Sequence, residues 1–219
     1  MTEKSCVVVG AGPGIGLAVA KRFGREGFQL ALVARRAEAL AQYVADLEQT
    51  GLTAHAFPAD AADFNSLVQA FTQIQAQLGP PEVLVYNAAV VKPEPPSTLP
   101  VEDLSAAFRV NVAGALVCAQ QVIPEMKARQ RGTILFTGGG LALNPYPAYA
   151  SLAAGKAALR NLTYSLGADL EAEGIQVATV TIAGFVKPGT HFAPDLIAEK
   201  YWELHSQPPG QREREIVYR

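Results

Sequence analysis

The chain has 219 residues, of which 49% are hydrophobic and 17% are charged, and its 18 basic and 20 acidic side chains leave a formal net charge of -2. This length predicts one globular domain over residues 1–219. Because the charge is nearly balanced, we expect no general attraction to phosphate backbones or anionic lipid, which disfavours nucleic acid and membrane surfaces as partners.

Two cysteines and three histidines offer little for disulfides or metals. Cys6 and Cys118 lie in apolar runs far apart, and two thiols are too few for a disulfide framework or a cysteine-based zinc site. A reducing cytoplasm is the expected compartment. His55, His191 and His205 show no metal-ligand spacing, so no metal is expected. No segment approaches the ~18 apolar residues of a membrane span, and the apolar stretch near the start is too short for a signal peptide.

Short apolar or β-branched runs alternate with longer stretches of helical periodicity along the whole chain. Strands are predicted at 6–9, 29–33, 53–57, 82–86, 133–136, 176–182 and 215–218. Helices are predicted at about 14–26, 37–50, 61–78, 101–128, 151–173 and 192–205. This order predicts an α/β fold, a Rossmann-type doubly wound domain with a parallel sheet of about seven strands flanked by helices. Ligands of such sheets bind beyond the carboxyl ends of the strands.

A glycine-rich segment, Gly-Ala-Gly-Pro-Gly-Ile-Gly over residues 10–16, joins the first predicted strand to a helix. Glycines let the backbone turn tightly and approach a ligand, and the helix start offers unpaired N–H groups to a phosphate. The spacing is G-x-x-x-G-x-G, because Ile15 stands where G-x-G-x-x-G needs glycine. A tight connection without a ligand is the alternative. The predicted phosphate-binding residues are Gly10, Gly12, Pro13, Gly14, Ile15 and Gly16.

The second predicted strand ends in Arg35 and Arg36, with no carboxylate before Glu38. A free ribose 2′-hydroxyl is usually met at this place by Asp or Glu, whereas a 2′-phosphate calls for Arg. The alternative is a pair of solvated charges, but cations are unfavourable at a helix N-terminus unless something anionic offsets them. The two arginines therefore favour NADP over NAD as cofactor.

Asp60 follows the third predicted strand, and an Asn-Ala-Ala segment follows the fourth. With the glycine spacing, these residues make the chain resemble the short-chain dehydrogenase/reductase family over essentially its whole length. The resemblance implies that Asp60 and Ala61 lie near the adenine; Asp60 is alternatively an N-cap, with Asp63 in the first helical turn. It implies that the cofactor cleft is also lined by Asn87, Ala88 and Ala89. Ala89 replaces the usual glycine of the family.

Two helix residues and one loop match further family positions. Asn111 lies on the apolar face of helix 101–128, where the family's asparagine holds a proton-relaying water; a structural asparagine bridging backbone groups is the alternative. Lys156 lies on the buried stripe of helix 151–173, where the family's lysine binds the nicotinamide ribose. The segment after strand six is similar to the family's Pro-Gly segment around the nicotinamide amide, which implicates Gly184 and Val186.

The family's catalytic pattern is broken in this chain. Its tyrosine, four residues before the lysine, is Leu152 here, and its serine, thirteen residues earlier, is Gly139. Neither side chain can donate a proton. Tyr149, three residues before Leu152, is the favoured replacement acid. The alternative is that its aromatic ring only fills space in the loop. The predicted catalytic residues are Lys156, Asn111 and Tyr149.

The resemblance implies an NADP-dependent oxidoreductase acting on a small-molecule carbonyl or alcohol, with an altered or impaired catalytic site. The alternative is a non-catalytic NADP(H)-binding protein, either a sensor or a partner subunit. Because the family assembles through its two long helices, here 101–128 and 151–173, a homodimer or homotetramer is expected. Segment 191–209 is predicted to shape the substrate pocket, with Tyr201 and Trp202 as lid or core residues.

Overall fold

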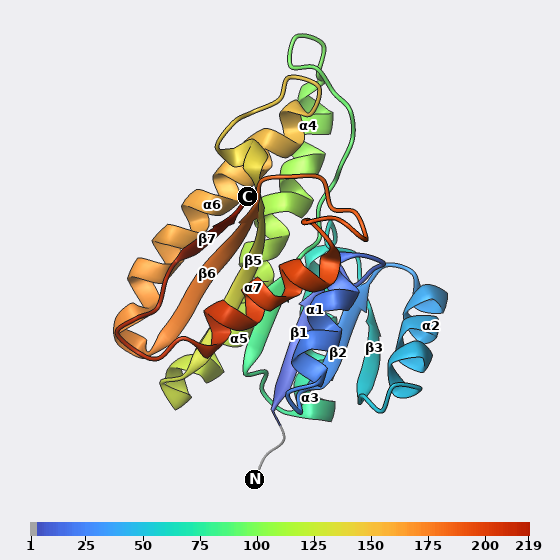
Figure 1. Cartoon of the computed structure of the whole chain (residues 1–219), viewed down its shortest axis with the longest axis vertical. Helices are drawn as coiled ribbons and strands as arrows, with labels where there is room; N and C mark the ends of the chain where they lie inside the picture. Colours follow the sequence, from blue (N-terminus) through green and yellow to red (C-terminus); the bar gives the residue numbers. More distant parts are fainter. Residues whose placement is uncertain (1–3) are drawn as a thin grey trace.

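A computed structural model describes residues 4–219, so the first three residues of the predicted domain lie outside the described part. Within residues 4–219 the chain forms seven strands, β1 (Ser5–Val9), β2 (Gln29–Ala34), β3 (Ala54–Pro58), β4 (Val83–Tyr86), β5 (Gly132–Gly139), β6 (Ile175–Ile182) and β7 (Glu215–Tyr218). All pair in parallel, in the order β3-β2-β1-β4-β5-β6-β7 (Figure 1). The predicted doubly wound α/β domain is confirmed.

The strand order reverses between β1 and β4, because β1 pairs with β2 on one side and with β4 on the other. Strands β1, β4 and β6 are buried along their whole length. Continuous apolar runs of this kind are expected where helices cover both faces of a parallel sheet. The crevice at such a reversal, beyond the carboxyl ends of the strands, is where open α/β sheets bind ligands.

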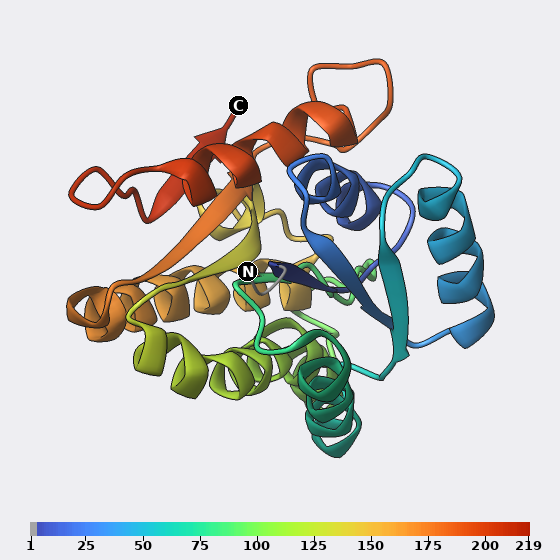
Figure 2. The same cartoon turned by 90° about the horizontal axis from the view of Figure 1, so that it is seen from below.

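Helices cover the sheet on both faces (Figure 2). One layer contains α1 (Ile15–Gly24), α2 (Ala37–Glu48) and α7 (Pro194–Ser206). The other layer contains α3 (Phe64–Leu78), α4 (Val101–Phe108), α5 (Gly114–Arg129) and α6 (Ala150–Leu170). Each layer buries its own apolar cluster against the sheet: the first cluster lies under α1, α2 and α7, and the second under α3, α5 and α6. The six predicted helices are therefore present, with shifted ends.

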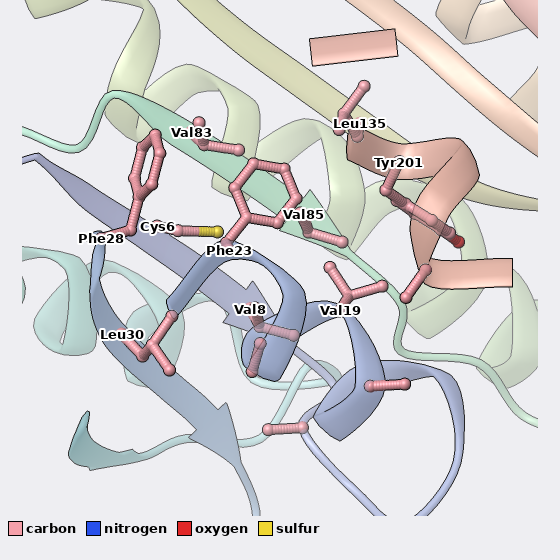
Figure 3. Close-up of a cluster of buried hydrophobic side chains, with 14 of the residues drawn as sticks. Cys6, Val8, Val19, Phe23, Phe28, Leu30, Val83, Val85, Leu135 and Tyr201 are labelled. Carbon is pink, nitrogen blue, oxygen red and sulfur yellow. The ribbon is translucent and has the colours of Figure 1, made fainter. Parts of the chain in front are cut away.

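Helix α7 packs against α1 as well as the sheet. In the first apolar cluster Phe23 of α1 and Tyr201 of α7 lie over Val85 and Leu135 (Figure 3). Tyr201 is completely buried, whereas its neighbour Trp202 is half-buried at the edge of the cluster. Of the two readings given for Tyr201, lid or core, the core position is confirmed.

The helix predicted at 101–128 is continuous but changes its hydrogen-bonding pattern in the middle. Between α4 and α5 the turn widens into a π-helix, Arg109–Ala113, that contains the buried Asn111. Such single π turns insert an extra residue and often occur at functional sites. Short 3-10 turns, Gly140–Ala142 and Glu171–Glu173, follow β5 and α6.

The helix predicted at 61–78 begins later, at Phe64, because Asp63 caps it. The Asp63 carboxylate accepts hydrogen bonds from the backbone N–H groups of Asn65 and Ser66. The interpretation of Asp60 as the N-cap, with Asp63 in the first turn, is therefore wrong. Asp60 is left in the loop at the carboxyl end of β3.

By length and composition alone, the helical stretch Val101–Arg129 is long and apolar enough to cross a membrane, although it contains no unbroken run of about 18 apolar residues. The stretch has 29 residues, and 39% of its most apolar window is buried inside the protein. Its inner side chains, among them Ala115, Cys118 and Val122, belong to the second apolar cluster under the sheet. One face of this helical stretch therefore packs in the core.

Candidate functional site

The glycine-rich segment forms a turn that is pressed against the end of β4. Gly10 has a φ of +84°, and a Cβ placed on it would lie 2.4 Å from the backbone nitrogen of Ala88. A Cβ on Gly16 would lie 2.6 Å from the carbonyl oxygen of Gly10. Gly12, in contrast, has no neighbour within 4 Å of such a Cβ, so its backbone is open. Glycine at 10 and 16 therefore allows close packing, and glycine at 12 leaves space beside the turn.

A cavity of about 640 Å³ opens beside this turn, at the carboxyl ends of β1 to β4. It brings together residues from five separate stretches of sequence. The predicted cofactor residues that line it are Gly10, Gly12, Pro13, Arg35, Arg36, Asp60, Ala61, Asn87, Ala88 and Ala89. Gly14, Ile15 and Gly16 follow directly, where the turn enters α1. The remaining predicted residues lie in the π turn Arg109–Ala113, at the N-cap of α6, on α6 itself and in the loop after β6.

Both arginines at this cavity are exposed and lack protein partners. Arg36 occupies the N-cap position of α2 without a capping hydrogen bond from its side chain. Within residues 4–219, neither Arg35 nor Arg36 makes a side-chain hydrogen bond or an ion pair with another residue. Two unneutralised guanidinium groups therefore stand at a helix start, which is where cations are least favourable without an anion.

Asp60 organises the loop that forms the opposite wall of the cavity. Its Oδ1 accepts a hydrogen bond from the backbone N–H of Ala62 at 2.9 Å, and its own N–H donates to Ser66 Oγ. This turn places Ala61 beside Asp60 on the cavity wall.

Asn87 connects the glycine turn to the neighbouring strand. Its Nδ2 donates to the carbonyl oxygen of Gly10 at 3.0 Å, and its Oδ1 accepts from Thr137 Oγ1 at 2.9 Å. Thr137 Oγ1 lies 2.7 Å from the hydroxyl of Tyr201. Tyr201 was not predicted to contribute to the cofactor site, because its partner is 64 residues away in the chain.

Lys156 lies on α6 with only 8% of its surface exposed, and its Nζ donates to the carbonyl oxygen of Thr137 at 2.5 Å. Burial lowers the pKa of Lys156 to about 8. One helical turn earlier lies the buried Leu152. Across from the lysine stem, a Cβ on Gly139 would lie 3.5 Å from Lys156 Cγ, which is ordinary contact. The space beside this lysine therefore admits a small side chain at position 139.

Asn111 sits in the π turn and faces α6. Its Oδ1 accepts a hydrogen bond from the backbone N–H of Val90 at 2.7 Å, as the structural interpretation requires. Its Nδ2 is buried and has no partner among the described residues. A Cβ on Gly155 would lie 2.9 Å from this nitrogen, so the amide packs directly beside the residue before Lys156. Among the described residues, both N–H donors of this amide are thus left without a partner, beside the residue that precedes the lysine.

Tyr149 lies directly before α6, at its N-cap, and its side chain is half-buried. Its ring is 6.3 Å from that of Tyr146, centroid to centroid. Seven residues, or about two helical turns, separate it from Lys156. The helix therefore begins too late to include Tyr149.

A buried carboxylate that the sequence did not reveal ties the loop after β4 to this helix start. Glu94 is only 6% exposed; its Oε2 accepts from Ser151 Oγ at 2.6 Å, and its Oε1 lies 2.7 Å from Lys92 Nζ. Two hydrogen bonds lower the pKa of the Glu94 carboxyl group: the one from Lys92 has the larger effect, and the one from Ser151 the smaller. The backbone of Glu94 also pairs with that of Tyr149. Glu94 therefore fixes the loop that carries Tyr149.

The loop after β6 lies at the same edge of the sheet. Gly184 packs against the Phe192 ring, since a Cβ there would lie 2.2 Å from it. Phe185 is 90% exposed and Val186 is 41% exposed. Among residues 4–219, no group of three His, Cys, Asp or Glu side chains is placed to hold a metal ion.

A comparison with models of protein families finds one that matches most of the chain. The family model described as short chain dehydrogenase matches residues 4–196. The protein belongs to this family of oxidoreductases.

Curated proteins and solved structures agree with this assignment. The chain is 33% identical to 2,3-dihydro-2,3-dihydroxybenzoate dehydrogenase of Bacillus subtilis (strain 168) over 178 residues, 81% of this chain and 68% of the relative. A metagenomic short-chain oxidoreductase in complex with NADP superposes with a TM-score of 0.90 at 26% identity, covering 98% of this chain and 96% of that one. A short-chain dehydrogenase from Rhodopseudomonas palustris superposes with a TM-score of 0.89 at 27% identity, covering 99% and 98%.

Proposed function

We propose that the protein is an NADP-dependent oxidoreductase that acts on a carbonyl or alcohol substrate. The observation that carries this proposal is the pair Arg35 and Arg36, which are exposed at the cavity beside the glycine turn and have no side-chain partner among residues 4–219. A 2′-phosphate would neutralise both guanidinium groups, whereas a free 2′-hydroxyl would neutralise neither. The metagenomic relative in complex with NADP supports the same choice.

The residues present fit a dinucleotide. The cavity of about 640 Å³ is large enough for a cofactor-sized ligand. The open backbone at Gly12 and the start of α1 are suited to a pyrophosphate, Asp60 and Ala61 to the adenine, and Asn87 to Ala89 to the cleft wall. Gly184 and Val186, at the end of β6, are the proposed contacts for the nicotinamide amide.

When bound, NADPH would supply a hydride to the substrate's carbonyl carbon. The chain's own residues must then bind and orient the reactants and deliver a proton to the resulting oxygen. Lys156 retains two N–H donors beyond its bond to Thr137, and these suit ribose hydroxyls. The spare Nδ2 donor of Asn111 suits a water beside Lys156. Tyr149 is the proposed proton donor, because this half-buried tyrosine directly precedes the helix that carries Lys156.

The second candidate function is NADP(H) binding without catalysis, as a sensor or a partner subunit. Leu152 and Gly139 favour it, because they stand where the family carries its tyrosine and serine. General acids contribute about 10²–10⁴-fold to rate, so a site without one would turn over slowly even with both reactants in place.

The test that separates the two functions is NADPH oxidation across a panel of aldehydes, ketones and quinones. We expect turnover by the wild type and a loss of about 10²-fold in Tyr149→Phe. Tyr146→Phe is the matched control, because this tyrosine is neighbouring but 60% exposed. Unchanged activity in Tyr149→Phe would remove Tyr149 as the acid. NADPH binding without turnover of any substrate would favour the sensor or partner subunit.

We further propose that the chain forms a homodimer or homotetramer through the face built by α4, α5 and α6. These helices lie side by side in one layer (Figure 2). Leu104, Phe108, Val112 and Leu116 recur every four residues along the long helical stretch and are all half-exposed. Small residues on α6, Ala154 and Ala157, are exposed and would permit close approach of a second helix pair.

A further inference from the structure

Three hydrogen bonds, one buried and two partly buried, connect α7 to the glycine turn through Thr137 of β5. The Tyr201 hydroxyl lies 2.7 Å from Thr137 Oγ1, which lies 2.9 Å from Asn87 Oδ1. The Asn87 Nδ2 in turn lies 3.0 Å from the carbonyl oxygen of Gly10. Tyr201 is fully buried and Thr137 is 5% exposed, so water does not compete at this end of the chain of bonds.

The chemistry of the groups fixes the direction of every bond. The Gly10 carbonyl oxygen only accepts, so the amide nitrogen of Asn87 faces it and the amide oxygen faces Thr137. That oxygen also only accepts, so the single hydroxyl proton of Thr137 is used there. Tyr201 must therefore donate to Thr137. The tyrosine is therefore the outermost donor of this series of hydrogen bonds.

Thr137 also binds Lys156, the buried lysine of the site. Its carbonyl oxygen accepts the hydrogen bond from Lys156 Nζ, while its hydroxyl holds Asn87. A shift of Thr137 would therefore displace both Lys156 and, through Asn87, the glycine turn.

We infer that Tyr201 is a positioning residue for the cofactor: through Thr137 its hydroxyl holds Asn87 and the glycine turn in the geometry that binds the dinucleotide. This inference rests on the proposed NADP binding. Tyr201 lies on α7, outside the cofactor cavity, and its ring packs in the core beside Val19 and Leu135 (Figure 3). The ring and the hydroxyl thus have separate roles.

Tyr201→Phe separates these roles, because it keeps the ring and removes only the donor. We expect NADPH to bind about tenfold more weakly to this variant, since the buried Thr137 oxygen loses its partner and Asn87 its fixed orientation. Thr163→Val is the matched control: Thr163 is also fully buried, but its hydroxyl donates to the Leu159 carbonyl within its own helix, α6. We expect this control to bind NADPH as the wild type does.

A double-mutant cycle tests whether the effect passes through Thr137. If it does, Tyr201→Phe weakens NADPH binding in the wild-type background and has no further effect in Thr137→Val. Equal affinity of Tyr201→Phe and wild type, an equal loss in Thr163→Val, or additive effects of the two site variants would each overturn the inference.

Hydrogen exchange of the unliganded protein distinguishes this inference from the proposed function. We expect faster amide exchange over residues 10–14 in Tyr201→Phe than in Thr163→Val. If the wild type binds neither NADPH nor NADH, the proposed function fails, while faster exchange in the glycine turn still supports the link to Tyr201. Unchanged exchange there overturns the link whatever the wild type binds.

Discussion

Gly10 is the residue at which the glycine turn is fitted to the sheet. It combines a φ of +84° with a backbone neighbour 2.4 Å from the place of a Cβ. Gly10→Ala should therefore lower the free energy of unfolding by about 2–4 kcal/mol, from strain and overpacking together. Urea denaturation followed by circular dichroism measures this.

Gly12→Ala is the matched variant, because nothing lies within 4 Å of its Cβ position. We expect its free energy of unfolding to stay within about 0.5 kcal/mol of the wild type, while its affinity for NADPH falls because the methyl group enters the cavity. Equal destabilisation of the two variants would contradict the assigned geometry of the turn.

Restoring both hydroxyls tests whether the rest of the catalytic site is intact. Gly139→Ser fits without a clash beside Lys156, and Leu152→Tyr places a phenol one helical turn before it. The double variant should raise NADPH-dependent carbonyl reduction by about 10²-fold or more. Gly139→Ser with Leu152→Phe supplies similar bulk without the phenol and should show no such gain. If the tyrosine variant binds NADPH but gains nothing over the phenylalanine variant, the cleft has diverged beyond these two positions.

The sequence pointed to candidate residues that are marked by their position along a single strand or helix. It did not point to residues whose hydrogen-bond partner is far away in the chain. Arg35, Arg36 and Lys156 could be predicted from a strand end and a helical stripe. Glu94 and Tyr201 could not, because their partners, Ser151 and Thr137, are 57 and 64 residues away. No local pattern records such pairs.

At the scale of elements, strands were predicted where apolar runs are continuous, and their ends were predicted less well. Strand β5 extends to Gly139, although glycines are poor strand formers, because its end pairs with β6. The π turn at Arg109–Ala113 was not predicted, since the apolar periodicity continues on both sides of it. Asp60 and Asp63 were both plausible caps by residue type, and only the backbone geometry distinguishes them.

The contact between α7 and α1 should depend on pH through His205. This side chain lies among the rings of Phe23, Phe28 and Trp202, and its Nδ1 is 3.0 Å from Thr133 Oγ1. Burial lowers the pKa of His205 to about 4. The unfolded chain, with an ordinary pKa of about 6.5, therefore binds more protons than the folded one between these values.

The contribution of neutral, buried His205 to the free energy of unfolding is therefore complete above about pH 6.5 and is lost as the pH falls towards 4. We expect on the order of 2–3 kcal/mol of the free energy of unfolding to disappear across this window. His205→Gln keeps a polar side chain but does not titrate, and should flatten this part of the curve. Urea denaturation of both proteins between pH 7 and pH 4 measures the difference, and parallel curves would contradict it.

At the scale of the whole molecule, the strand order explains why the predicted cofactor residues meet. Because all seven strands are parallel, the ends of β1, β2, β3 and β4 lie at one edge, and their loops share one cavity. The alternation of strands and helices was sufficient to predict this convergence. It did not predict that α7 would be linked to the same site through Tyr201, since the pattern fixes the order of helices and leaves their side-chain contacts open.

The most direct test of the account is calorimetric titration with NADPH and with NADH, on the wild type and on the double variant Arg35→Ala with Arg36→Ala. Arg25→Ala is the control, an exposed arginine just after α1, at the end of that helix away from the glycine turn. We expect the wild type and the control to bind NADPH at least about tenfold more tightly than NADH, and the double variant to lose that preference. Equal binding of the two nucleotides by the wild type, or a preference that survives removal of both arginines, would contradict the account.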